Sequence, residues 1–452
     1  MSGDLRDQLE RYGQDHLLDG WDRLDEVAQA SLAAELTAID WDQLDRLLAG
    51  ATDKASPALA GQAGPPPLVR LPETAEDRQR WDEASERGWS LLAAGRVAVL
   101  TVAGGLGTRL GFGHPKGLFP IMPVSGKSLF EHFAESVRAR GNRAGRPLPW
   151  LVMTSDVTHE ETESYFREHD YFGIDPDDVW LFRQGNMPIV DATSRRVLLS
   201  EPGHLALNPD GHGGLLEALE QAGMFPRLAE RGVEQLFSHQ VDNPAVLLAD
   251  PPLLGWHDQQ GSRLTTRVVS KRSAEERMGV VVEIEGAVRI LEYFEIPPER
   301  AAATDDQGRL LLWAGNTAVH VLDLSFLEQV AGLADALPFH RVEVGQSTAE
   351  KTIGFERFLF DLLPLTDVAL VVESDRETEF LPLKNIEGVD SPERVQQGLV
   401  ERFGRWLIAT GADVSAAGPV EISPLFAQDV DELAAKVAAG TRFEGTVRLT
   451  VD

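Results

Sequence analysis

A glycine-rich stretch from Gly104 to Gly117 contains Arg109 and Lys116, the residues with the clearest chemical potential in the sequence. Glycine permits positive φ and close approach of the main chain, so successive N–H groups can converge on an oxyanion. Arginine adds a planar fork of donors, and lysine adds a point charge. The chain holds 72 Asp and Glu against 42 Lys and Arg, yet no acid lies between Thr101 and Lys127. The stretch is therefore predicted to bind a polyanion.

The spacing of these glycines excludes two common phosphate-binding motifs. A dinucleotide fingerprint needs its third glycine where Leu110 stands, and Gly111 comes one residue late. A Walker A loop ending in Gly126-Lys127-Ser128 needs a glycine where Ile121 stands. The sequence also lacks G-x-S-x-G and H-E-x-x-H patterns, so it gives no support to a serine triad or a zinc hydrolase.

The glycine-rich loop must be positioned by the elements around it, and their pattern indicates an α/β fold. Short β-rich runs alternate with helix-length amphipathic segments, which is typical of a parallel sheet covered by helices. Strands are predicted over residues 97–102 and 150–154, and helices over residues 128–139 and near 160–168. From 263 to 296 the pattern changes to successive strands, including 279–284 and 288–296.

The two ends of the chain have their own character. Apolar residues at helical spacing over the first 50 positions predict helices, which we expect to form an exposed appendage before residue 70. Residues 51–67, rich in Ala, Gly and Pro, are expected to be a connector. A helix over 429–438 and a strand over 446–451 predict a small C-terminal lobe. The expected domains are a helical region with linker (1–85), a catalytic domain (86–385) and that lobe (386–452).

Composition narrows the class of protein. A length of 452 residues fits two or three domains. The formal charge of −30 argues against nucleic acid or an anionic membrane as the main partner, although it allows a small phosphorylated ligand. The absence of cysteine removes disulfides and thiolate chemistry. Neither a secretory signal nor a membrane-spanning run is visible, so a cytoplasmic location is expected.

The stretch from Gly104 to Lys116 resembles the nucleotide-binding loop of the UDP-sugar pyrophosphorylases, most of all the UDP-N-acetylglucosamine branch. Further segments resemble the same family in the same order along nearly the whole chain. They are Gly13-Gln14-Asp15-His16-Leu17-Leu18 with Trp21, Pro149–Ser155, Gln184-Gly185 with Pro188, Pro209–Gly214, Val241-Asp242-Asn243, Ala314-Gly315-Asn316, Pro382-Leu383-Lys384-Asn385 and Val420–Leu425.

The resemblance implies a fold and a reaction. The fold would be a Rossmann-like α/β/α sandwich of the nucleotide-diphospho-sugar transferase type. The reaction would join UTP to a sugar 1-phosphate and release pyrophosphate, with Mg²⁺. Arg109 and Lys116 would hold the phosphates, and Lys384 would meet the sugar phosphate and the α-phosphate. These cations would offset the repulsion of two anions, so neither a Ser nor a His nucleophile is expected.

Other roles are carried over position by position. By resemblance, Gly104 and Gly105 would lie against the nucleotide, and Gln184 and Gly211 would read the uracil edges. Asp242 would bind Mg²⁺, a hard cation that accepts carboxylate oxygen. It follows an apolar run at 233–241, where the carboxyl end of a strand is expected.

The residues expected to contact the sugar bear on which sugar 1-phosphate is the substrate. By resemblance, Gly279, Glu292 and Asn316 would contact the sugar, together with His212. The acetylglucosamine branch usually has Asn where this chain has His212, whereas histidine resembles the UDP-glucose and broad-specificity branches. N-acetylglucosamine 1-phosphate is placed first, glucose 1-phosphate or a broad range of sugars second. Two other classes stay open: a non-catalytic nucleotide-sugar-binding relative and a dehydrogenase on a similar sheet.

Overall fold

The computed structural model describes residues 3–50, 60–333, 336–344 and 351–451 of the chain. The chain divides into two compact units. The smaller unit comprises Met1–Ala55, Gln184–Ala218 and Leu333–Asp361. The larger unit comprises Ser56–Arg183, Leu219–Gly332 and Leu362–Asp452. The domain boundaries predicted at residues 85 and 385 remain a prediction.

The larger unit is built on a nine-stranded mixed sheet. Its main path runs β12-β11-β13-β9-β1-β2-β3, and β10 joins β13 to β16. The strands β9, β1, β2 and β3 are parallel, and β13 is antiparallel to both β9 and β10. The bounds are β1 Val97–Val102, β2 Trp150–Thr154, β3 Val179–Arg183, β9 Gln235–Gln240, β10 Leu264–Ser270, β11 Val280–Ile284, β12 Ala287–Leu291, β13 Ala314–Asp323 and β16 Ala369–Glu373.

The sheet confirms the α/β class and most of the predicted strands. β1 and β2 have the predicted bounds, because each is a fully or almost fully buried apolar run. The predicted strand over 288–296 is wrong at its end: β12 stops at Leu291, where the backbone of Glu292 instead donates to the Glu295 carboxylate at 2.8 Å. That local bond turns the chain away from the sheet.

Helices cover the sheet and share its apolar core. The bounds in the larger unit are α5 Ala75–Ala94, α6 Leu129–Ala144, α7 Asp156–Glu168, α9 Met224–Glu230, α10 Pro251–Gln259, α11 Pro298–Ala301, α12 Leu324–Ala331, α13 Arg376–Glu379 and α14 Pro392–Ala409; α8 covers Leu215–Gln221. α6 begins after Ser128, whose hydroxyl accepts from the Glu131 amide while the Glu131 carboxylate accepts from the Ser128 amide. This capping box defines the predicted helix start.

Two glycines allow α5 and α10 to cross closely. A Cβ on Gly88 would lie 1.9 Å from the Pro251 carbonyl oxygen, and one on Gly255 would lie 1.7 Å from the Ala84 carbonyl oxygen. Any larger residue at either position would force the two helices apart.

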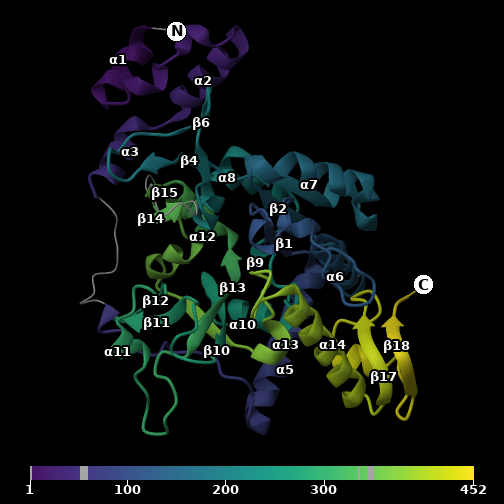
Figure 1. The fold of residues 1–452 in the computed structure, drawn as a ribbon. Coiled ribbons are helices and arrows are strands. Elements are labelled where there is room, and N and C mark those ends of the chain that lie inside the picture. Colours follow the sequence, from purple (N-terminus) through teal and green to yellow (C-terminus); the bar gives the residue numbers. More distant parts are fainter. Residues whose placement is uncertain (1–2, 51–59, 334–335, 345–350, 452) are drawn as a thin grey trace. The chain divides into compact units, whose positions relative to one another are not determined.

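The C-terminal lobe is a parallel strand pair, β17 (Asp413–Ile422) and β18 (Arg442–Leu449), with helix α15 (Val430–Ala434) between them, drawn in yellow in Figure 1. The predicted helix over 429–438 is shorter in the structure. The predicted strand over 446–451 begins four residues earlier and ends at Leu449.

The smaller unit corrects the expectation of an exposed helical appendage. Its helices α1 (Gly3–Arg11), α2 (Glu26–Ala38) and α3 (Trp41–Leu48) share one buried core with strands that come much later in the chain. Leu9, Leu36, Val190 and Phe355 are all fully buried in that core. The strands are β4 Asn186–Pro188, β5 Val190–Asp191, β6 Leu199–Glu201, β7 His204–Leu205, β8 Leu207–Pro209, β14 Phe339–Val344 and β15 Thr352–Arg357.

The N-terminal motif Gly13-Gln14-Asp15-His16 has a structural purpose in this unit. The buried Gln14 amide donates to the Arg195 carbonyl and accepts from the Val197 amide, both at 3.0 Å. His16 Nε2 lies 2.8 Å from the Val197 carbonyl oxygen. The two side chains therefore pair with the main chain of residues 195–197.

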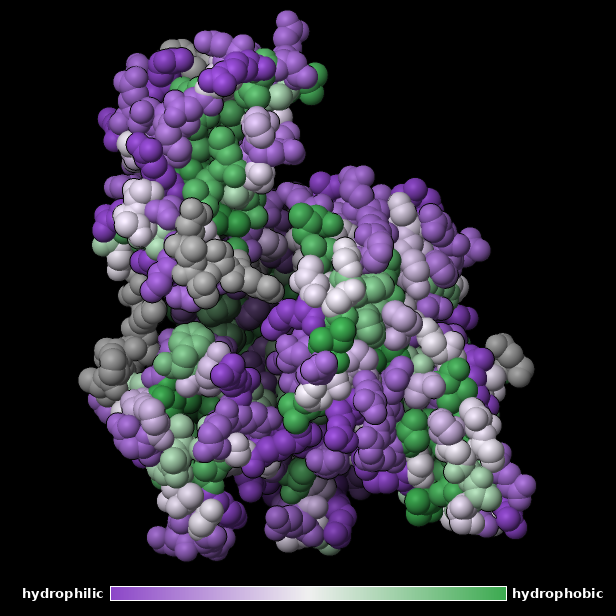
Figure 2. Space-filling view, viewed as in Figure 1, coloured by the Kyte–Doolittle hydropathy of each residue, from purple (hydrophilic) through white to green (hydrophobic). Residues whose placement is uncertain are grey.

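The surface fits the composition. On the face drawn in Figure 2 most exposed residues are hydrophilic, as a formal charge of −30 leads one to expect. No helix among the described residues is long and apolar enough to cross a membrane.

Candidate active site

The glycine-rich loop begins directly after β1 and presents unpaired main-chain amides. Within the described residues the N–H groups of Gly104, Gly105 and Leu106 donate no hydrogen bond, whereas their neighbour Ala103 donates to the Met153 carbonyl at 2.7 Å. A Cβ placed on Gly105 would meet nothing within 4 Å. Three free donors beside open space at the carboxyl end of a parallel strand form a cradle suited to an oxyanion.

The loop folds back so that Lys116 returns to its start. The Lys116 amide donates to the Gly105 carbonyl at 3.0 Å, and the Gly107 amide donates to the His114 carbonyl at 2.9 Å. A Cβ on Gly107 would lie 2.9 Å from Phe112, so the turn depends on glycine there. Gly105 and Lys116, both predicted as site residues, are thus neighbours.

Lys116 lies in a cluster of largely buried charged side chains. Its Nζ is 4.0 Å from Asp242 Oδ2, and the two side chains are only 12% and 15% exposed. Burial lowers the pKa of Lys116; Asp242 opposes this effect, and the charges of Arg109 and Lys384 add to it.

Main-chain hydrogen bonds fix the rest of the cluster. The Leu383 amide donates to the Asp242 carbonyl at 2.7 Å, which sets Lys384 beside the turn that follows β9. The Ile386 amide donates to the Arg109 carbonyl at 3.1 Å. Arg109, Lys116, Asp242 and Lys384 therefore gather at one edge of the sheet, although they span more than half of the chain.

The donor set at this edge fits Mg²⁺ held mainly by a substrate. Within the described residues no group of three or more His, Cys, Asp or Glu side chains could hold a metal ion. Asp242 offers a single partly exposed carboxylate. Mg²⁺ keeps several waters and is commonly bound by one or two carboxylates together with substrate phosphates, so one carboxylate is compatible with it.

The three predicted sugar residues of the larger unit are also adjacent. The Asn316 amide donates to the Gly279 carbonyl at 2.8 Å. A Cβ on Gly279 would lie 3.1 Å from Glu292 Oε1. The Asn316 side-chain oxygen accepts from the Ala318 amide at 3.0 Å, which orients its amide group. Together these residues offer a carboxylate and a carboxamide, groups that can bind sugar hydroxyls.

The remaining predicted residues, Gln184, Gly211 and His212, belong to the smaller unit. Gln184 is buried, and the next residue, Gly185, accepts from the Asp210 amide at 3.0 Å. Gly211 has a φ of 85°, and a Cβ there would lie 2.5 Å from the Arg357 carbonyl oxygen, so no other residue fits. The Gln184 segment and the Gly211 turn are thus neighbours within this unit.

His212 is held in an aromatic enclosure that the sequence did not reveal. Its ring lies 5.4 Å from that of Phe358 and 5.6 Å from that of Phe360. Nδ1 accepts from the Leu359 amide at 3.0 Å, and burial lowers the pKa of His212 to about 4, so the ring is neutral at pH 7. The alternation Phe358-Leu359-Phe360 was the only signal for this contact.

Arg357 was not predicted from the sequence as a residue of this region. Its guanidinium pairs with Asp210 at 2.8 Å and also with Glu217. The Arg357 amide donates to the Asp210 carbonyl at 2.7 Å. Arg357 therefore ties the end of β15 to the glycine-rich turn at 209–214.

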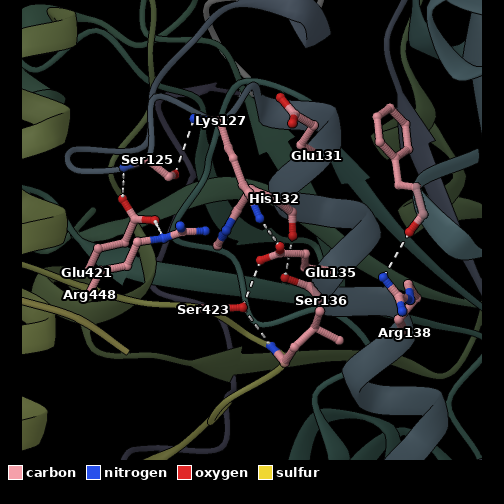
Figure 3. A network of polar contacts seen from close by, with 12 residues as sticks. Ser125, Lys127, Glu131, His132, Glu135, Ser136, Arg138, Glu421, Ser423 and Arg448 are labelled. Carbon is pink, nitrogen blue, oxygen red and sulfur yellow. Dashed lines mark hydrogen bonds and ion pairs between the residues drawn. The ribbon is translucent and has the colours of Figure 1, made fainter. Parts of the chain in front are cut away.

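The C-terminal lobe holds the turn between the glycine-rich loop and α6 (Figure 3). The buried Glu421 carboxylate accepts from the Val124 and Ser125 amides at 2.8 and 2.9 Å, with Arg448 3.6 Å away. On α6, Glu135 pairs with Lys127 and accepts from the Ser423 hydroxyl at 2.9 Å. The lobe thus fixes the turn that leads from the loop into α6.

The chain is similar to known proteins along most of its length. Residues 71–389 match the model of the UTP–glucose-1-phosphate uridylyltransferase family. The human "UDP-N-acetylhexosamine pyrophosphorylase-like protein 1" is 35% identical, over 90% of this chain and 86% of that protein. The Saccharomyces cerevisiae "UDP-N-acetylglucosamine pyrophosphorylase" is 31% identical over 91% and 92%. The Trypanosoma brucei uridine diphosphate N-acetylglucosamine pyrophosphorylase, solved with an inhibitor, is similar with a TM-score of 0.81 and 26% identity, over 96% of this chain and 95% of that one.

Proposed function

Because the chain belongs to the UTP–glucose-1-phosphate uridylyltransferase family, we propose that it joins UTP to N-acetylglucosamine 1-phosphate and releases pyrophosphate. It is a nucleotidyltransferase of the UDP-sugar pyrophosphorylase type. The observation that carries this function is the gathering of Arg109, Lys116, Asp242 and Lys384 next to the free amides of the glycine-rich loop.

The chemistry follows from charge. A phosphate oxygen of the sugar phosphate attacks the α-phosphorus of UTP in line; a new P–O–P bond forms as the bond to the β-phosphate breaks, and pyrophosphate carries the electron pair away. The attacking oxygen is already ionised at neutral pH, so no general base is needed. The enzyme's work is neutralisation and alignment.

The cations of the cluster supply most of that work. A cation about 4 Å from a phosphate oxygen is worth roughly 4 kcal/mol at an effective dielectric near 20. Arg109 and Lys116 serve the UTP phosphates, and Lys384 serves the two reacting groups. The loop amides of Gly104 and Gly105 add donors that need no rearrangement, because the main chain already holds them in place.

Mg²⁺ is part of the proposal, with Asp242 as its protein ligand. When bound, it would neutralise phosphate charge and template the triphosphate. The uracil contacts of Gln184 and Gly211, and the sugar contacts of Gly279, Glu292, Asn316 and His212, stay predictions. A cytoplasmic location is also proposed, since UTP and Mg²⁺ are supplied there.

The direct test measures pyrophosphate release from UTP, Mg²⁺ and N-acetylglucosamine 1-phosphate, with glucose 1-phosphate in a parallel reaction. We expect faster turnover with the acetylated sugar. Asp242→Asn and Lys384→Ala should each lose turnover by at least about 100-fold, because each removes a charge that the two anions need. Both proteins should stay folded by circular dichroism.

Matched controls are the exposed residues Asp306→Asn and Lys351→Ala, which should keep full turnover. Full turnover in both site variants would contradict the assigned roles. Binding of UTP without any turnover of the parent protein would instead point to a non-catalytic nucleotide-sugar-binding relative.

A further inference from the structure

Asn243, the residue after Asp242, joins two segments of the cluster through its side chain. It is 4% exposed. Its oxygen accepts from the Leu381 amide at 3.0 Å, and its nitrogen donates to the Glu379 carbonyl at 2.8 Å. The oxygen also accepts from the Ala245 amide at 3.2 Å, which fixes the plane of the carboxamide. One buried side chain thus spans the turn after β9 and the segment that leads to Lys384.

The same two segments are joined a third time through the main chain. The Leu383 amide donates to the Asp242 carbonyl at 2.7 Å. Glu379, Leu381 and Leu383 therefore bond in alternation to the Asp242-Asn243 turn. Pro382 lies between the last two and limits the backbone further. Lys384 is the next residue, so its Cα is fixed relative to Asp242.

A buried ion cluster supports this segment from the sheet side. Arg267 on β10, 3% exposed, bonds to Glu379 with one guanidinium nitrogen and to Asp250 with another. Its carbonyl accepts from the Thr317 hydroxyl at 2.8 Å, on the neighbouring β13. Only an arginine has the planar fork that can bridge two carboxylates in this way.

We infer that Asn243 and Arg267 are positioning residues that set Lys384 opposite Asp242, an inference that rests on the proposed function. Neither side chain belongs to the cluster of phosphate-facing groups; both act through the segment from Glu379 to Lys384. A displacement of about 1 Å at a reacting group can cost on the order of 100-fold in rate, so loss of either tether should reduce turnover well before the protein unfolds.

A double-mutant cycle tests this inference. Turnover is measured for the parent, Asn243→Ala, Lys384→Ala and the double variant, well below their melting temperatures. Asn243→Ala should lower kcat by about 10- to 100-fold with a smaller change in KM for UTP, because the glycine-rich loop is untouched. In the Lys384→Ala background the same change should have almost no further effect, since the group it positions is absent. Higher enzyme concentrations and longer reaction times keep turnover measurable in the Lys384→Ala background.

A purely structural role gives a different result. In that case Asn243→Ala would lower turnover by the same factor in both backgrounds, and the inference would be wrong. Unchanged turnover in Asn243→Ala, with Lys384→Ala impaired, would also overturn it while leaving the proposed function intact. Full turnover in Lys384→Ala would instead contradict the proposed role of Lys384 itself.

Arg267→Lys is the second variant, because lysine keeps the charge but loses the fork. It should show the same fall in kcat with little change in KM for UTP. The control is Arg263→Lys, a nearby arginine that is 43% exposed and pairs with Asp323 at 3.0 Å. Equal turnover in the two variants would exclude Arg267 from the tether. If Arg267→Lys does not fold, the Asn243 cycle alone decides.

Discussion

Lys116 is a site residue whose buried positive charge should lower the stability of the folded protein while it favours the binding of phosphate. Burial lowers its pKa, which means that the folded protein without substrate disfavours the charged form. The folded state binds fewer protons at this group than the unfolded state wherever pH lies between the lowered pKa and 10.5. The cost of the buried charge is therefore full below the lowered pKa and disappears as pH rises from there through 10.5.

Lys116→Met should abolish most activity without lowering stability. Turnover is expected to fall by about 1,000-fold, the equivalent of one cation near a phosphate. The melting temperature at pH 7 should equal or exceed that of the parent, and the difference should shrink toward pH 10 as the parent's lysine loses its proton. Differential scanning fluorimetry across pH, with and without UTP, checks this; a less stable variant at pH 7 would contradict it.

His212 is predicted to affect which sugar 1-phosphate the enzyme prefers. Its neutral ring fills the space beside Phe358 and Phe360. His212→Asn keeps an acceptor for the Leu359 amide and opens room next to both aromatic rings. We expect the ratio of kcat/KM for N-acetylglucosamine 1-phosphate over glucose 1-phosphate to rise several-fold, roughly the effect of 1 kcal/mol. An unchanged ratio would remove His212 from sugar selection.

At the scale of elements, the C-terminal lobe stabilises the turn between the glycine-rich loop and α6 through one carboxylate. Glu421→Gln keeps one oxygen for the Val124 and Ser125 amides, but it removes the negative charge and turns an NH2 donor toward the Arg448 guanidinium. It should cost about 1–3 kcal/mol in the free energy of unfolding, measured with urea. The control is Glu444→Gln on the neighbouring strand β18, where the side chain is 67% exposed. Equal losses in the two variants would show that the buried bonds contribute nothing special.

Sequence predicts the local elements well and their distant partners poorly. β1, β2 and the start of α6 are set by apolar runs and by a capping box, all within a few residues. The partner of Ser125, in contrast, is Glu421, almost 300 positions away, and no local pattern marks the pair. The family resemblance predicts Asp242 and Lys384 as site residues. No local pattern marks Asn243, because its role depends on two main-chain groups near residue 380.

At the scale of the whole molecule, buried histidines make stability depend on acid. Burial lowers the pKa of His132 and His257 to about 4 and that of His239 to about 3. The folded state holds each ring neutral, while the unfolded chain takes up protons below about pH 6.5. The stability that these rings contribute is thus present above pH 6.5 and is lost as pH falls from there toward 4.

The free energy of unfolding, measured with urea, should therefore fall between pH 6.5 and 4, by about 1.4 kcal/mol for each pH unit and histidine. His239→Gln should flatten this dependence. In the parent, the Thr101 hydroxyl lies 2.7 Å from His239 Nε2 and accepts from the Trp150 indole at 2.8 Å, an arrangement that a neutral ring completes. A parallel shift of the whole curve, with no change in slope, would contradict the assignment.

The shared core of the smaller unit has a consequence for synthesis in the cell. Leu9 and Leu36 emerge early from the ribosome, yet Phe355, which closes their core, is made some 300 residues later. At typical elongation rates that interval lasts roughly tens of seconds. During this time the core around the first helices stays incomplete and part of its apolar surface is exposed. The nascent chain should therefore need chaperone protection at its leading end, and slow decoding between these points would favour aggregation over folding.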